Sequence, residues 1–240
     1  MAEQCLVVSC HVEQPLDDAA WGAFSLLQAR RPGGAEIAAL VRPPDPDAGE
    51  SESLWIARAR IAAARGPFGL HTHWGGAAQA RPDGAGDPAA LVRSQLDWLD
   101  ERGFQPRLFA GGGWYIDESV AAVLGERGVA DCTATAFRPD YLEAGAPRLE
   151  LAEPAVLRVG GVRVTELPTT HSLGMAASAA LRRLPAYVHV YFHDTDLLDV
   201  RRSRALTFAL NVLGRRRRPA RLDRLEVAGE VEFSSAASGP

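Results

Sequence analysis

The chain has 240 residues, of which 47% are hydrophobic and 23% are charged, and its formal net charge at pH 7 is −4. An apolar fraction of this size with so small a net charge excludes a chain that is disordered throughout. Cys5, Cys10 and Cys132 are too few, and odd in number, for a disulfide scaffold. Because Cys5 and Cys10 lie an odd number of residues apart on one expected strand, we expect them to face opposite sides of it.

The same observations indicate a single domain. No apolar run approaches the roughly 20 residues that a membrane-spanning helix needs. The apolar segment 5–12 has no basic segment before it and no cleavage site after it, which are the marks of an export signal. We therefore expect a cytoplasmic protein with one domain over residues 1–233 and a flexible tail over residues 234–240.

Short β-rich segments alternate with longer segments of helical periodicity. The expected strands are 5–12, 68–72, 107–109, 130–133, 162–167 and 187–192. The expected helices are 19–30, 54–65, 88–102, 117–127, 173–184 and 201–213. Asp87 and Asp117 stand where N-cap residues of two of these helices are expected. This alternation predicts an α/β fold with a parallel sheet covered by helices, either doubly wound or closed into a barrel.

Two pairs of metal-ligand residues stand at the ends of expected strands. His11 and Glu13, like His71 and His73, are two residues apart, which puts both side chains of a pair on one face of a strand. The C-terminal ends of strands are where α/β proteins build active sites. Two imidazoles and a carboxylate suit a divalent metal, zinc first, and iron, cobalt, nickel or manganese also accept this set. The alternative is a group of hydrogen-bonded polar residues at strand ends.

A third polar cluster follows the last expected strand. Residues 187–193 alternate between Tyr187, His189, Tyr191 and His193 on one face and Val188, Val190 and Phe192 on the other. The apolar face should pack under helices. His193, with Asp194 or Asp196 close by, is a candidate general acid or base with an orienting carboxylate. The alternative is a strand end followed by an acidic cap of the next helix.

The order of these motifs resembles that of the polysaccharide deacetylase (NodB-homology, carbohydrate esterase family 4-like) superfamily, of which the chain would be a divergent member. Segment 9–13 stands at the family's first motif, and segment 68–74 resembles its metal-histidine motif. Segments 109–117, 131–133 and 191–199 resemble the groove wall, the strand after it and the motif with the catalytic histidine. The resemblance covers most of the chain and implies a single distorted (β/α)7-type barrel.

The resemblance also implies an activity. It is that of a metal-dependent carbohydrate N-deacetylase, a hydrolase of non-peptide C–N bonds that uses a metal-activated water. By this resemblance Glu13, His71 and His73 would hold the metal. His193, oriented by Asp196, would protonate the departing amine. His11 stands where the family has an aspartate base, so it would be the base or a fourth ligand.

Four residues near these motifs are candidates for substrate binding. Trp114 and Tyr115 offer flat apolar surfaces suited to a sugar ring, and the alternative for both is ordinary packing of a loop. The arginine that the family has before the groove-wall glycines is replaced here by Ala110, and Arg107 is the nearest substitute. His171 follows a strand end and is a further candidate for the mouth of the site, and the alternative is a structural role in its loop.

The expected substrate is small, because no export signal is expected. It would be an N-acetylated amino sugar on a nucleotide, lipid or natural-product precursor. Two alternatives stay open: hydrolysis of a different C–N amide on the same fold, and a degenerate barrel that only binds a glycan or a partner. His11 and Gly75 depart from the family pattern and keep the second alternative open. Nucleic-acid binding through the arginines at 215–218 is not expected, since cations are favoured near a helix C-terminus and the chain is net acidic.

Overall fold

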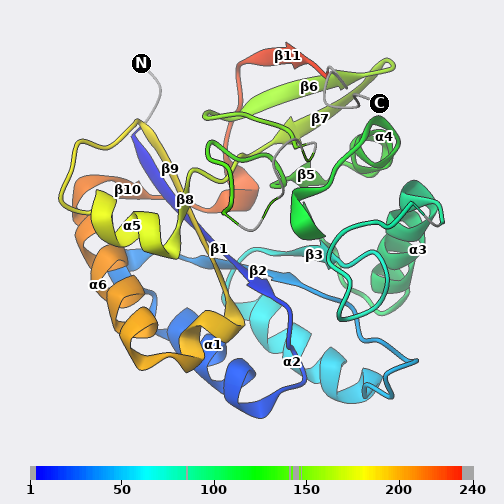
Figure 1. Ribbon diagram of the computed structural model, residues 1–240, viewed down its shortest axis with the longest axis horizontal. Coiled ribbons are helices and arrows are strands. Elements are labelled where there is room, and N and C mark those ends of the chain that lie inside the picture. The colour runs from blue at the N-terminus through cyan, green and yellow to red at the C-terminus, as the bar shows by residue number, and fades with distance from the viewer. Residues whose placement is uncertain (1–3, 85, 141, 143–145, 147, 234–240) are drawn as a thin grey trace.

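The computed structural model describes residues 4–84, 86–140, 142, 146 and 148–233, so the tail expected over 234–240 lies outside the described residues. The strands are β1 (Cys5–Val12), β2 (Ile37–Val41), β3 (Phe68–Thr72), β4 (Leu108–Gly111), β5 (Ala130–Asp131), β6 (Ala155–Val159), β7 (Val162–Glu166), β8 (His171–Ser172), β9 (Tyr187–His193), β10 (Arg218–Pro219) and β11 (Glu230–Glu232). The α-helices are α1 (Asp18–Arg30), α2 (Glu52–Arg65), α3 (Pro88–Glu101), α4 (Glu118–Arg127), α5 (Leu173–Ala179) and α6 (Val200–Arg216). These helices lie around the outside of the sheet (Figure 1).

The sheet is parallel apart from the antiparallel β6–β7 hairpin, and its strand order is β11-β6-β7-β5-β4-β3-β2-β1-β9-β8. Residues 167–170, between β7 and β8, connect the two sides of this order. The N–H groups of Leu167 and Thr169 donate to Asp131 and Ala134 beside β5, and the N–H of Thr170 donates to His189 on β9. The run of strands from β7 through β5, β4, β3, β2, β1 and β9 to β8, with residues 167–170 between its two ends, is the (β/α)7-type barrel predicted from the sequence.

Two apolar layers follow from the alternation of side chains along buried strands. On β1, Val8 and Cys10 face the layer under the helices, whereas Cys5 and Val7 face the barrel interior. The prediction that Cys5 and Cys10 point to opposite sides is therefore confirmed. Strand β2 is not predicted from the sequence, because its five residues are all buried and lack the alternation that marks a half-buried strand.

Side-chain caps begin the helices at the expected places. The carboxylates of Asp87 and Asp117 accept hydrogen bonds from the N–H groups of Ala90 and Val120, 3.1 and 2.8 Å away, at the starts of α3 and α4. Both predicted N-caps are thus confirmed. Among the described helices, none has both the length and the apolar character that crossing a bilayer demands.

Helix α5 ends at Ala179, before the predicted end at residue 184. The backbone carbonyl groups after Ala179 accept hydrogen bonds from two arginines, one at the end of α6 and one at its C-cap. Arg216 donates to the carbonyls of Ala180 and Arg182, and Arg217 donates to those of Leu184 and Pro185. Two members of the arginine run therefore hold the chain between α5 and β9, which is a structural role.

Charge is unevenly distributed around these two neighbouring helices. Segments 167–193 and 200–222 contain no aspartate or glutamate, yet they hold ten of the chain's 26 basic residues. Helices α5 and α6 pack against each other along one side of the barrel (Figure 1). The excess of arginine belongs to α6 and the residues after it, since α5 has no charged residue, and Asp196, just before α6, pairs with Arg202.

Gly69 gives a test of strand packing beneath the expected metal ligands. A Cβ atom at this position would overlap the Leu108 carbonyl oxygen and the side chain of Leu40. Gly69→Ala is expected to lower the free energy of unfolding by about 1–3 kcal/mol. The control is Gly22→Ala on α1, where a Cβ meets nothing within 4 Å, and a gain of about 0.5–1 kcal/mol is expected. Urea unfolding of both variants measures the difference, and equal stabilities would contradict it.

Candidate metal centre and active site

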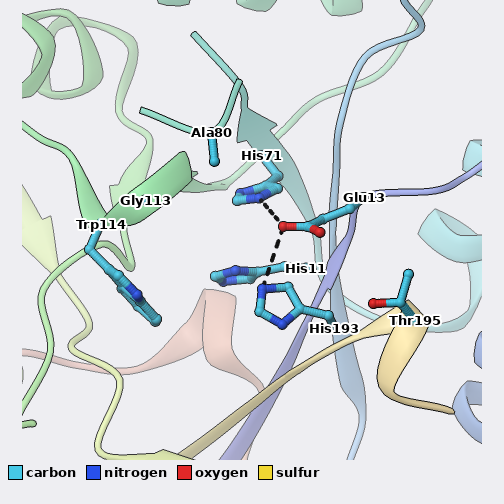
Figure 2. A pocket seen from close by; sticks show the side chains of 8 residues that line it. All are labelled: His11, Glu13, His71, Ala80, Gly113, Trp114, His193 and Thr195. Carbon is cyan, nitrogen blue, oxygen red and sulfur yellow. Dashed lines mark ion pairs between the residues drawn. The ribbon is translucent and has the colours of Figure 1, made fainter. Parts of the chain in front are cut away.

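The side chains of His11, Glu13, His71 and His193 converge at the carboxyl ends of β1, β3 and β9 (Figure 2). The cavity beside them has a volume of about 190 Å³. Its lining residues are His11, Glu13, His71, Ala80, Gly113, Trp114, His193 and Thr195. Strand register explains the convergence, because His11 pairs with His193 across β1 and β9, so both side chains reach the same edge.

Glu13 lies at the centre of the histidines. Its Oε1 atom is 3.7 Å from Nε2 of His71, 3.5 Å from Nε2 of His73 and 3.5 Å from Nε2 of His193. Glu13, His71 and His73 form a group whose potential ligand atoms all lie within 4.8 Å of one another. The group thus takes both members of the second sequence pair and Glu13 of the first.

The hydrogen bonds of the two imidazoles fit a metal. Nδ1 of His71 is 3.0 Å from the Ala110 carbonyl, and Nδ1 of His73 is 2.8 Å from that of Ala77. A carbonyl only accepts, so both Nδ1 atoms carry the proton and both Nε2 atoms carry a lone pair. These Nε2 atoms are buried and have no hydrogen-bond partner among the described residues. Metal-binding histidines commonly have this arrangement, with Nδ1 bound to a carbonyl and Nε2 free for the metal.

His11 lies against this group without joining it. Its ring stacks on that of His71 with centroids 4.5 Å apart, and its buried Nε2 also lacks a partner within the described part of the chain. Burial and the neighbouring His71 and His193 hold the pKa of His11 well below its usual range. The ring is therefore neutral at pH 7, which is the form that accepts a proton or binds a metal.

Electrostatics favour an ionised Glu13. Burial tends to raise the pKa of Glu13, but the contacts from His71 and His73 and the charge of His193 outweigh it and hold that pKa well below its usual range. Burial lowers the pKa of His71, and the contact with Glu13 only partly offsets this, so the ring of His71 is neutral at pH 7. An ionised carboxylate at Glu13 and a neutral imidazole at His71 are the protonation states that metal ligands require.

His193 has the opposite hydrogen-bond pattern to His71 and His73. Its ring accepts a hydrogen bond from the backbone N–H of Asp196, so in the neutral ring Nε2 carries the proton and points at Glu13. The expected orienting role of the Asp196 carboxylate is only partly met. Its Oδ2 lies 3.9 Å from Nδ1 and instead accepts the His193 N–H at 3.0 Å. Its Oδ1 pairs with Arg202 at 2.8 Å. Asp196 thus orients His193 through the backbone.

Trp114 forms one wall of the cavity. It adopts φ 60°, in the left-handed region, directly after Gly113 with the same φ. A bulky residue in this conformation is strained and marks a position held by its surroundings. The indole contacts the rings of His11 and Tyr191, with centroids 5.7 and 4.8 Å away. Tyr115 does not line the cavity. Its hydroxyl donates to Asp117 at 2.6 Å and its ring packs edge-on against Trp74.

Two predicted substrate-binding residues lie elsewhere. Arg107 precedes β4, at the end of that strand opposite to Gly111, and lines other cavities with Val129. The structure therefore does not bring Arg107 to the site, because the whole length of β4 lies between Arg107 and the groove-wall glycines. His171 lies on β8 beside Val190, where its Nδ1 is 2.8 Å from the Thr170 hydroxyl, and is not among the cavity residues.

A buried carboxyl pair, which is not predicted from the sequence, lies on β5 and β7. Asp131 and Glu166 pair across β5 and β7 and are fully buried. Burial raises the pKa of both, and the neighbouring Asp131 raises that of Glu166 well above its usual range, so Glu166 holds a proton that it donates to Asp131. No local sequence pattern predicts this pair, because its two members lie on strands that are far apart in the chain.

Comparison with solved structures identifies the fold. A polysaccharide deacetylase assigned in Mycobacterium smegmatis matches with a TM-score of 0.58 and 15% identity over 95% of this chain and 96% of that one. The 4-α-glucanotransferase of Thermococcus litoralis matches with a TM-score of 0.57 and 16% identity over 95% of this chain. This chain spans 40% of the length of that enzyme.

No family model matches the chain, and no curated protein matches it in sequence. The likeness is therefore one of fold. It extends over nearly the whole of the Mycobacterium smegmatis protein as well as of this chain. The resemblance predicted from the order of the motifs is confirmed at the level of the fold, which this chain shares with the Mycobacterium smegmatis polysaccharide deacetylase.

Proposed function

We propose that the protein is a metal-dependent hydrolase that removes the N-acetyl group from a small amino-sugar substrate. The observation that carries this proposal is the Glu13, His71 and His73 group beside His193 in one cavity. The fold shared with an assigned polysaccharide deacetylase supports it. Zinc is the expected metal, since two imidazoles and a carboxylate leave a position open for water.

The residues around the group have separable roles in this proposal. Glu13, His71 and His73 bind the metal through one oxygen and two unprotonated Nε2 atoms. When bound, the metal supplies an activated water and stabilises negative charge on the substrate oxygen. The neutral His11 is placed to accept a proton at Nε2, and His193 is placed to donate one from Nε2 to the departing amine. Trp114 excludes water on one side and offers a face for a sugar ring.

The cavity favours a small substrate. Its volume of about 190 Å³ is below the roughly 300–1,000 Å³ of sites that hold drug-sized ligands. The walls from Ala80 and Trp114 bound it on two sides. One sugar ring of a free, nucleotide-linked or lipid-linked precursor fits this description better than a long stretch of polysaccharide.

The test combines metal analysis with product analysis. Protein purified without chelator or histidine tag is expected to hold about one equivalent of metal and to release acetate from an N-acetylated amino sugar or its nucleotide conjugate. Dialysis against a chelator should stop acetate release, and added zinc should restore it. A metal-loaded protein that releases no acetate would contradict N-deacetylation and favour hydrolysis of a different C–N amide. A protein that takes up no metal would favour a binding barrel.

His193 provides a separate prediction. His193→Asn is expected to lower kcat about 10²–10⁴-fold, because general acid catalysis contributes on this scale. Metal content should not change, since the His193 ring accepts the Asp196 N–H and therefore carries a proton on Nε2, which leaves no lone pair there for the metal. Single-turnover acetate release and elemental analysis check both points, with His171→Asn as the matched histidine control outside the cavity. Loss of the metal together with activity would instead make His193 a ligand.

A further inference from the structure

A chain of hydrogen bonds connects the buried carboxyl pair to His71. The Ala110 carbonyl accepts from Nδ1 of His71 at 3.0 Å, and the N–H of the next residue, Gly111, donates to Oγ1 of Thr133 at 2.8 Å. These two groups belong to the same peptide unit. The Thr133 hydroxyl then donates to Oδ1 of Asp131 at 2.6 Å. The path therefore crosses from a candidate metal ligand to a buried carboxylate through one peptide group.

Strand register produces this path. His71 pairs with Ala110 across β3 and β4, Phe109 pairs with Asp131 across β4 and β5, and Asp131 pairs with Glu166 across β5 and β7. The path thus runs sideways through four neighbouring strands, where every member is buried.

Each donor and acceptor in the path has a defined direction. The Thr133 hydroxyl has one proton, which it gives to Asp131, so toward Gly111 it can only accept. Asp131 also accepts the backbone N–H of Thr133 at 3.0 Å, and Glu166 is held by the N–H of Ala134 at 3.0 Å. A buried carboxylate at one end polarises the bonds in series, which strengthens the carbonyl as an acceptor at the other end.

We propose that Asp131, Thr133 and Glu166 are positioning residues for the metal centre: through the 110–111 peptide group they fix the ring of His71 with its proton on Nδ1 and its lone pair on Nε2. This inference rests on the proposed function. The arrangement has the role of the carboxylate that commonly binds the second nitrogen of a metal-binding histidine, with a hydroxyl and a peptide group inserted between them. Glu166, by holding a proton, keeps Asp131 as the single negative charge of the pair.

A matched pair of variants tests the hydroxyl. Thr133→Val keeps the shape of the side chain but removes the donor and acceptor, whereas Thr133→Ser keeps the hydroxyl. Partners that orient metal ligands contribute about 10–100-fold in metal affinity, and we expect about tenfold weaker zinc binding for Thr133→Val and less than about threefold for Thr133→Ser. Competition with a chromophoric chelator measures the affinity, and the visible spectrum of bound Co²⁺ reports the ligand geometry without any assay of activity.

The outcomes separate this inference from the proposed function. Weaker metal binding with an altered Co²⁺ spectrum in Thr133→Val alone supports it. Equal zinc affinities in both variants and the wild type, whatever the change in melting temperature, would overturn the positioning role and leave the metal centre intact. A wild type that binds neither zinc nor Co²⁺ would overturn the proposed function and this inference together. If Thr133→Val does not fold, Glu166→Leu, which leaves Asp131 unpaired, is measured in its place against Glu166→Gln, and equal affinities overturn the role in the same way.

Discussion

Replacing His71 and His73 together by alanine is expected to reduce the bound divalent metal from about one equivalent to none. Both residues present a buried, unpartnered Nε2 toward Glu13, and no other described histidine combines this with a protonated Nδ1. Because a metal supplies several kcal/mol of transition-state stabilisation, acetate release should fall by about a thousandfold or more.

The melting temperature provides an independent test of metal binding by the same double variant. A ligand that binds only the folded state raises the melting temperature, so a chelator should lower that of the wild type and leave that of the double variant unchanged. His171→Ala, outside the cavity, is the control and should respond to the chelator as the wild type does. Retention of metal by a folded double variant would place the centre elsewhere.

Glu166→Gln is expected to change how stability depends on pH. Glu166 is fully buried and protonated in the folded chain, because burial and Asp131 raise its pKa well above the usual value of 4.5. In the unfolded chain the residue ionises near that usual value. Between the two pKa values the folded state holds one proton more than the unfolded state, so the free energy of unfolding falls by about 1.4 kcal/mol per pH unit from this group.

The wild type and Glu166→Gln should differ in how their free energies of unfolding change with pH. The contribution of Glu166 is fully present below pH 4.5 and is lost as the pH rises toward its folded pKa. Glutamine keeps a donor for Asp131 and does not ionise, so the variant should lack this loss and become the more stable protein at alkaline pH. Urea unfolding from pH 4.5 to pH 9 measures both curves, with the exposed Glu153→Gln as control. If the free energies of unfolding of the wild type and of Glu166→Gln changed in parallel with pH, Glu166 would not be protonated in the folded chain.

The sequence predicted the parts of the site that depend on local spacing. His71 and His73 stand two residues apart at the end of a buried strand, and this alone placed them on one face. The alternation on β9 likewise placed His193 at the interior edge with its apolar neighbours under the helices. In both cases one strand determines the geometry, so a short stretch of sequence is sufficient.

The sequence could not predict three features, for different reasons. Arg107 is close to the groove-wall glycines in sequence, but the length of β4 separates them. Asp131 and Glu166 meet only because β7 follows a hairpin and returns beside β5, so register across the sheet decides this pair. The tautomer of His193 depends on the conformation of the turn that brings the backbone N–H of Asp196 to its ring, which residue types alone do not reveal.

The arginines of segments 167–193 and 200–222 have a consequence for how charge is distributed along the chain. These segments hold ten basic residues and no carboxylate, so the rest of the chain has a formal charge of −14 at pH 7. Carboxylates from outside the segments pair with two of these arginines, Asp196 with Arg202 and Glu36 with Arg221. Because such surface pairs are screened by salt, the contribution of this attraction to stability should fall as ionic strength rises.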